Sequence, residues 1–315
     1  MTITEPTATA DAPVREELSK EERHRLSEGA RAEEHLGWLL CAPAVIVLLA
    51  VAAFPMGYAI YLSLQRYDLR FPSAAKFIGF SNYGTVLTNQ YWWRAFLITV
   101  IITVISVALE LVIGMAFALV MHRTLVGRGL VRTTILIPYG LVTVVAAFSW
   151  QYAWTPGTGY LANLLPSGSA PLTHTFQATA IIILAEVWKT TPFMALLLLA
   201  GLSLVPDDLL RAARMDGATA WQRFTKVILP LMKPAILVAL LFRTLDAFRI
   251  FDNIYILTQG QNKTGSVCIL AYDNLFTNLN LGLGSTVSVL IFITVGLIAF
   301  LYVKLFGAAV PGSEV

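Results

Sequence analysis

Charged side chains are scarce in this sequence of 315 residues, because Asp, Glu, Lys and Arg together make up only 13% of it. A soluble domain carries roughly a quarter of its residues as these four types. Hydrophobic residues make up 57%, so little polar surface remains to face water. The scarcity of charge therefore argues against a soluble enzyme and indicates an integral membrane protein.

Several chemical constellations are also missing. The two cysteines, Cys41 and Cys268, are too far apart to form a disulfide framework, and the four histidines are scattered, so no metal cluster is expected. A net charge of +3 excludes a strongly basic nucleic-acid binder. No G-x-x-x-x-G-K-[S/T], G-x-S-x-G or H-E-x-x-H motif occurs. We therefore expect no enzyme and no bound cofactor, and any transport must be driven by a partner ATPase or an ion gradient.

Six apolar stretches are each long enough for the roughly 20 residues that cross a hydrocarbon core. A bilayer offers no partner for backbone N–H and C=O groups, so stretches of this length must be helical. We predict an all-α integral membrane protein with spans at about 36–64, 95–121, 133–154, 177–203, 234–257 and 284–307. They form a transmembrane domain over residues 35–310, between a charged N-terminal tail (1–34) and a short C-terminal tail (311–315).

Lys and Arg are distributed unequally between the loops. Fourteen lie in the N-terminal tail, in the loops after the second and fourth spans and near the C-terminus, whereas five lie in the other loops. The richer side is expected to be cytoplasmic. We predict a multi-pass protein of the cell membrane, surrounded by lipid, with both termini in the cytoplasm.

The cytoplasmic loop between the fourth and fifth spans, residues 207–230, has a pattern of its own. Leu209 and Leu210 give its first part an apolar face, and Gly217 permits a sharp break. A second short helix is expected to stop at Pro230. A helix–break–helix on the membrane surface suits docking to a soluble partner, and an interfacial anchor is the alternative interpretation.

The residues of this loop resemble the EAA motif of ABC importer permeases, with one departure, an Arg where the motif usually begins with Glu. The matching positions are Arg211, Ala212, Ala213, Asp216, Gly217, Ala218, Phe224 and Pro230. The stretches at 186–210 and 248–260 resemble the carbohydrate-uptake branch of this family. MHRTLVGRGLVRT and YAWTPGTGYLANLLP are similar to permeases for trehalose. The resemblance covers roughly residues 36–307.

This resemblance implies the fold of type I ABC importer permeases and a set of partners. These are a second homologous permease subunit, two ATP-binding subunits that carry ATP and Mg, and an extracytoplasmic sugar-binding lipoprotein. The implied function is that of a permease subunit in an ATP-driven, binding-protein-dependent importer of trehalose or a related disaccharide. The loop 207–230 would couple the ATPase to the spans. A gradient-driven secondary transporter or channel for a small polar solute is the alternative, and a membrane-embedded enzyme is a third.

Ionisable side chains at membrane depth are costly and therefore mark candidate functional residues. In the fourth span they share one helical face with a threonine and an aromatic ring, and a second such face follows in the fifth span. Charged groups hydrogen-bond sugar hydroxyls, and an aromatic ring covers the C–H face of a pyranose. The resemblance points to a substrate path formed by Glu186, Lys189, Thr190, Phe193, Arg243, Asp246, Ala247, Ile250, Asp252 and Asn253.

A structural role for the same charges is the alternative. Six charges of balanced sign could form salt bridges that clamp the fourth and fifth spans to other helices. Glu110 stands alone in the second span, and we interpret it as a brace for a helix contact.

Overall fold

The computed structural model describes residues 36–306, apart from residues 37, 124–126 and 167–168. The predicted tails, 1–34 and 311–315, lie outside this part of the chain. The chain divides into two units, residues 1–58 and 59–315, and each is described by itself. An apolar helix begins at Trp38 in the first unit, passes through a π turn (η1, Leu49–Ala53) and continues into α2 (Phe54–Ser63), which extends beyond the unit's last residue, Tyr58.

Among the described residues, five helices are long and apolar enough to cross a membrane: Trp38–Ser63, Gln90–Arg123, Thr175–Leu202, Ala220–Ala247 and Leu281–Lys304. In the second unit they correspond to α4 (Gln90–Arg123), α7 (Thr175–Leu202), α10 (Leu229–Ala247) with the short elements before it, and α13 (Leu281–Phe306). These helices agree with five of the six spans predicted from the sequence.

The third predicted span is broken. The chain forms α5 (Arg128–Gly140) and α6 (Thr143–Ala153), whose axes differ by 86°. Pro138 lies inside the last turn of α5, where it has no backbone N–H for the helical hydrogen bond, and Gly140 ends the helix. The prediction of one continuous helix over 133–154 is therefore wrong.

The fifth predicted span differs at both ends. Pro230 does not stop a helix but lies in the first turn of α10, which continues without a break from α9 (Ala220–Arg223) through a π turn (η5, Phe224–Ile228). The span ends at Ala247, ten residues earlier than predicted, and α11 (Asp252–Thr258) follows as a separate helix. Ser266 donates from its hydroxyl to the carbonyl oxygen of Ile250 at 2.9 Å, so this break in the helix is held by a side chain.

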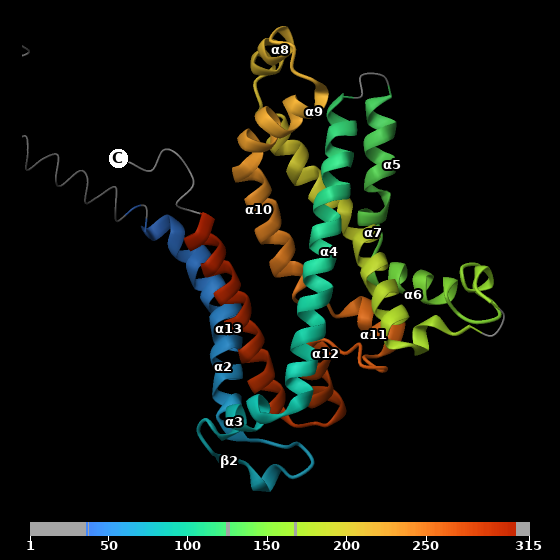
Figure 1. Cartoon of the computed structure of the whole chain (residues 1–315). Coiled ribbons are helices and arrows are strands. Elements are labelled where there is room, and N and C mark those ends of the chain that lie inside the picture. The colour runs from blue at the N-terminus through green and yellow to red at the C-terminus, as the bar shows by residue number, and fades with distance from the viewer. Residues whose placement is uncertain (1–35, 37, 124–126, 167–168, 307–315) are drawn as a thin grey trace, which may run out of the picture. The chain divides into compact units, whose positions relative to one another are not determined.

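Smaller elements lie between the spans. A two-stranded antiparallel hairpin, β1 (Gln65–Arg66) and β2 (Lys76–Phe77), encloses η2 (Pro72–Ala74) and is followed by α3 (Ser81–Thr88). The segments η3 (Ala162–Leu164), η4 (Pro171–Thr173), α12 (Val267–Tyr272) and η6 (Asp273–Thr277) complete this set. Figure 1 shows the hairpin and α3 at the opposite end of the helices from α8 (Asp207–Met215).

The core of the second unit forms where α7 packs along α4 and α10. Two glycines allow this close packing. A Cβ atom built on Gly114 of α4 would lie 2.9 Å from Cγ of Met194, and one built on Gly201 of α7 would collide with Cβ of Ala235 on α10. Small residues at helix contacts are typical of membrane bundles. The α7 helix is consequently the most enclosed of the five spans.

Replacing Gly201 with leucine is expected to destabilise the protein by about 1–3 kcal/mol, because the added side chain overpacks the contact with Ala235. Thermal unfolding of the purified protein in detergent measures the effect. Gly296→Leu on α13 is the matched control, since its Cβ would meet no atom within 4 Å. Equal melting temperatures for the two variants would contradict the proposed close contact.

Candidate functional site

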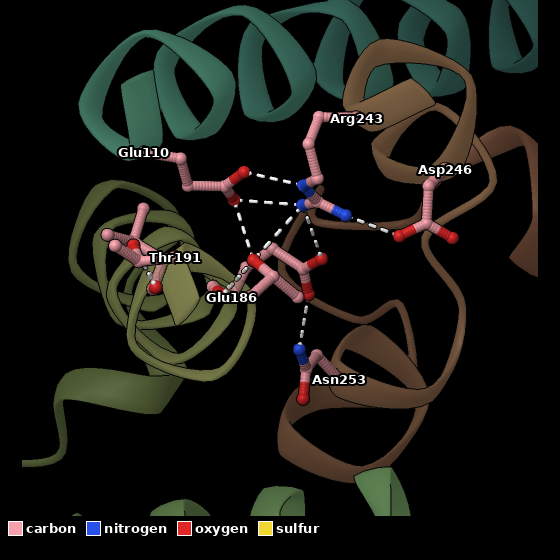
Figure 2. A network of polar contacts seen from close by, with 8 residues as sticks. Glu110, Glu186, Thr191, Arg243, Asp246 and Asn253 are labelled. Carbon is pink, nitrogen blue, oxygen red and sulfur yellow. Dashed lines mark hydrogen bonds and ion pairs between the residues drawn. The ribbon is translucent and has the colours of Figure 1, made fainter. Parts of the chain in front are cut away.

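Three carboxylates, those of Glu110, Glu186 and Asp246, gather around one guanidinium group, that of Arg243 on α10 (Figure 2). Its Nε donates to Oε2 of Glu110 at 2.6 Å, and its Nη2 donates to Oε1 of the same carboxylate at 2.9 Å. Both side chains are buried, with 1% of Arg243 and none of Glu110 exposed. This two-bonded ion pair joins α4 to α10 across 133 residues of sequence.

The remaining donors of Arg243 reach three further side chains. Nη2 lies 3.1 Å from the hydroxyl of Thr190 and 3.4 Å from Oε1 of Glu186, both on α7, and Nη1 donates to the carboxylate of Asp246. Asn253 of α11 donates from Nδ2 to Oε2 of Glu186 at 2.6 Å. Thus α4, α7, α10 and α11 meet in one polar network.

A cavity of about 600 Å³ opens beside this network. Its volume falls in the range typical of small-molecule sites. Seven of the residues predicted for a substrate path line it: Glu186, Lys189, Thr190, Asp246, Ile250, Asp252 and Asn253. These seven residues, which the sequence analysis grouped by helical spacing and resemblance, therefore line one cavity.

Three other predicted residues lie behind this wall. Arg243 directs its donors to protein carboxylates and the Thr190 hydroxyl, and Ala247 is buried in the apolar core between α4, α7 and α10. The ring of Phe193 stacks on Tyr139, with 5.4 Å between ring centroids and 16° between ring planes. Tyr139, and not Phe193, is the aromatic residue of this pair that lines the cavity.

The break between α5 and α6 supplies a part of the wall that the sequence analysis missed. Tyr139, Leu141, Val142 and Thr143 all line the cavity from this break. Nζ of Lys189 donates to the carbonyl oxygen of Leu141 at 2.8 Å and lies 5.7 Å from the centre of the Tyr139 ring. Pro138 beside Gly140 was the available sequence signal, because this pair interrupts an otherwise apolar helix.

The salt-bridge interpretation holds for Arg243 but not for every charge in the wall. Asp246 bonds to Arg243, yet 61% of its side chain is exposed. Within the described part of the chain, no ion pair involves Lys189, Arg249 or Asp252. The cavity therefore presents both acidic and basic groups, a wall suited to a ligand with many hydroxyls. In the same part of the chain, no group of three or more His, Cys, Asp or Glu side chains could hold a metal ion.

The predicted helix–break–helix is present in the loop before α10. The first helix, α8, ends at Met215, and Gly217 adopts a left-handed backbone with φ of +80°. Thr219 and Gln222 then form a reciprocal capping box at the start of α9. The aspartates at the start of α8 form no side-chain cap and instead lie in its first turn, where negative charge suits the helix dipole.

This loop lies at one end of the second unit (Figure 1). Several of its apolar side chains are exposed. No residue of α8 is buried, and Met215 and Trp221 are 89% and 71% exposed. The partly buried ring of Phe224 contacts that of Trp221, with 5.7 Å between ring centroids, and packs against the core formed by α4, α7 and α10. The loop thus combines exposed apolar side chains with one, Phe224, that packs against the helix core.

This chain is similar to known membrane permeases over most of its length. Residues 110–310 match the family described as "Binding-protein-dependent transport system inner membrane component". The chain is 66% identical to the trehalose transport system permease protein SugA of Mycobacterium tuberculosis, over 90% of this chain and 92% of that protein. It is 39% identical to the trehalose/maltose transport system permease protein MalF of Thermococcus litoralis, over 86% of this chain and 94% of that protein.

Solved structures show the same fold. A chain from a bacterial ABC transporter involved in the import of the acidic polysaccharide alginate superposes with a TM-score of 0.75. That match has 22% sequence identity and covers 89% of this chain and 98% of the other. At this identity the match bears on the fold alone.

Proposed function

Because this chain belongs to the binding-protein-dependent permeases of ABC importers, we propose that it carries trehalose or a closely related disaccharide across the membrane. The family assigns ATP hydrolysis to separate subunits, so this chain is the permease and not the enzyme. The identity of 66% to a permease named for trehalose supports the choice of sugar. Neither the family nor the fold supports a gradient-driven transporter.

The proposed assembly contains a second homologous permease, two ATP-binding subunits that hold ATP and Mg²⁺, and an extracytoplasmic sugar-binding lipoprotein. The exposed apolar side chains of Met215 and Trp221 support a docking role for the loop 207–230, because a soluble partner would cover them. We call this segment the docking loop. The excess of Lys and Arg in the loops on the α8 side supports a cytoplasmic location for that loop and for both termini.

We place the sugar in the cavity beside Arg243. Asp246 and Glu186 supply carboxylate oxygens for its hydroxyls, while Asn253 and Lys189 supply donors. Hydrogen bonds to charged groups contribute about 1.5–3 kcal/mol each. Arg243 and Glu110 hold these groups in place from behind the wall, so their part is positioning and not contact with the sugar.

One observation carries the proposed coupling between ATPase and sugar. A single continuous helix, Ala220–Ala247, has its first turn in the docking loop and Arg243 and Asp246 near its last turn. Its 28 residues extend over about 42 Å at 1.5 Å per residue. A displacement of the loop by the ATP-binding subunits would therefore be transmitted along this helix to one wall of the cavity.

Transport of radiolabelled trehalose by vesicles that contain the assembled importer tests this proposal. Asp246→Ala is expected to reduce uptake by about tenfold or more, because the free energy of one hydrogen bond to a charged group corresponds to a factor of about ten. The abundance of the complex should stay normal. The side chain is largely exposed, and Arg243 keeps its pair with Glu110, so folding is preserved. Asp68→Ala, which lies outside both the cavity and the loop 207–230, is the matched control.

Two outcomes would contradict the proposal. Unchanged uptake per transporter together with reduced abundance would assign Asp246 a purely structural role. Uptake that persists after ATP depletion, while the ion gradient is kept, would reject an ATP-driven importer.

A further inference from the structure

A second cavity lies along α5 and α7, two of the helices that also line the first cavity. It has a volume of about 400 Å³ and is lined by His122 of α4, Arg132 of α5, and four residues of α7, namely Leu196, Leu199, Ala200 and Ser203. The first cavity touches α7 at residues 186–190 and α5 at Tyr139. On both α5 and α7, the residues that line the second cavity lie nearer to the docking loop than those that line the first, because α7 leads into α8.

The stacked rings of Tyr139 and Phe193 lie between the two cavities. Along α7, Phe193 falls between the residues that line the first cavity and those that line the second, and along α5 Tyr139 lies one to two turns from Arg132. The positions 186, 189, 193, 196, 200 and 203 follow a spacing of three and four residues, so they share one face of α7. On both helices, the aromatic pair therefore separates the residues that line the first cavity from those that line the second.

Both rings are attached at points where their helices are locally weakened. Pro138 precedes Tyr139 inside α5, and Pro192 precedes Phe193 inside α7. A proline inside a helix removes one backbone hydrogen bond and is a common site of bending. Tyr139 also lies at the broken end of α5, so a change in the 86° break would move its ring relative to α7.

The second cavity has polar donors without carboxylates. The Nε atom of Arg132 is buried and has no hydrogen-bond partner among the described residues. His122 and Ser203 add polar groups, and Leu196 and Leu199 provide an apolar wall. An unpartnered donor is costly unless a passing hydroxyl or a water accepts its hydrogen bond. This wall suits brief contact with a neutral, hydroxyl-rich solute.

The geometry points to the Tyr139–Phe193 pair as this chain's half of the cytoplasmic gate, with the second cavity as the vestibule through which the sugar leaves. This inference rests on the proposed function for the direction of transport. It adds that Phe193 acts by holding the Tyr139 ring across the path, and that the two prolines allow the rings to separate.

Cysteine accessibility in the assembled importer tests the gate. Cys41 and Cys268 are first replaced with serine, and a single reporter is introduced as Thr143→Cys in the first cavity or Ser203→Cys in the second. A membrane-impermeant maleimide is added to inside-out vesicles in the presence of a non-hydrolysable ATP analogue. We expect rapid labelling at position 203 and slow labelling at position 143.

The variant Phe193→Ala is expected to increase the labelling rate at position 143 by about two- to tenfold, which is the shift that one stacked aromatic pair provides. Phe176→Ala is the matched control, because this residue of α7 is 85% exposed and lines neither cavity.

An unchanged rate at position 143 in Phe193→Ala would overturn the gate, and an unreactive cysteine at position 203 would overturn the vestibule. Trehalose uptake by the parent importer is measured separately. Labelling as expected without trehalose uptake would reject the proposed sugar while the gate stands.

Discussion

Replacing Glu110 with alanine is expected to destabilise the permease by about 3–5 kcal/mol, because it leaves a buried guanidinium without its main counter-charge. Arg243 is 1% exposed and makes its two-bonded contact with this carboxylate. The remaining carboxylates are a more distant Glu186, at 3.4 Å, and the exposed Asp246. Thermal unfolding of the purified complex and its abundance in the membrane measure the loss.

A double variant separates the two roles of this pair. Replacing Glu110 and Arg243 together, with leucine and methionine, removes both charges, and such apolar replacements of buried pairs are often neutral or stabilising. We expect the melting temperature to return toward that of the unchanged protein. Transport by this double variant should be lost even so, since Asp246 and Glu186 lose the guanidinium that positions them.

The exposed pair of Asp68 and Arg70 provides the matched control. It is also an Arg–carboxylate contact, at 2.6 Å, but 54% of the Arg70 side chain is exposed. Hydrogen bonds from Arg70 lower the pKa of Asp68 to about 2, so this pair stays ionised at neutral pH. Asp68→Ala should change the melting temperature little, because surface pairs are screened by solvent. An equal effect of Glu110→Ala and Asp68→Ala would contradict the account of the buried network.

The second large effect is expected at Gly217. Its φ of +80° is closed to proline, whose ring fixes φ near about −65°. Proline would also remove the backbone N–H that donates to the carbonyl oxygen of Arg214 at 3.1 Å. Gly217→Pro should therefore misplace α8 relative to α9 and abolish sugar uptake. ATP hydrolysis should no longer respond to the sugar-loaded binding protein, although the external sugar-binding step persists.

Gly157→Pro serves as the control for backbone strain, because Gly157 has a φ of +82° and its Cβ position is also open. It lies in the loop after α6 and not in the docking loop. We expect ATP hydrolysis in this variant to keep its response to sugar. Normal uptake in Gly217→Pro would mean that the break does not couple ATPase to transport.

Hydropathy and periodicity predicted most of the fold and much of the cavity wall. Continuous apolar runs must form helices in a bilayer, so five spans were predictable. The shared helical face of Glu186, Lys189 and Thr190 follows directly from their spacing. The docking loop was also predictable, because Gly217 interrupts two patterned segments.

The remaining features depend on contacts between distant residues. Glu110 and Arg243 are 133 positions apart, and no local pattern links them. Pro138 and Gly140 marked the α5–α6 break, but hydropathy alone did not reveal it, because apolar residues continue past Gly140 into α6. Phe193 does lie on the expected face, but the ring of Tyr139 lies between it and the cavity. In each case long-range packing decided which side chain reaches the site.

The most direct test of the central claim is a structure of the assembled importer with trehalose trapped within it. The account predicts sugar in the cavity between α7, α10 and α11, with hydroxyls within hydrogen-bond distance of Glu186, Asp246 and Asn253. The Glu110–Arg243 pair should remain intact behind the wall. Sugar bound elsewhere, or bound directly to Arg243 with this pair broken, would contradict it.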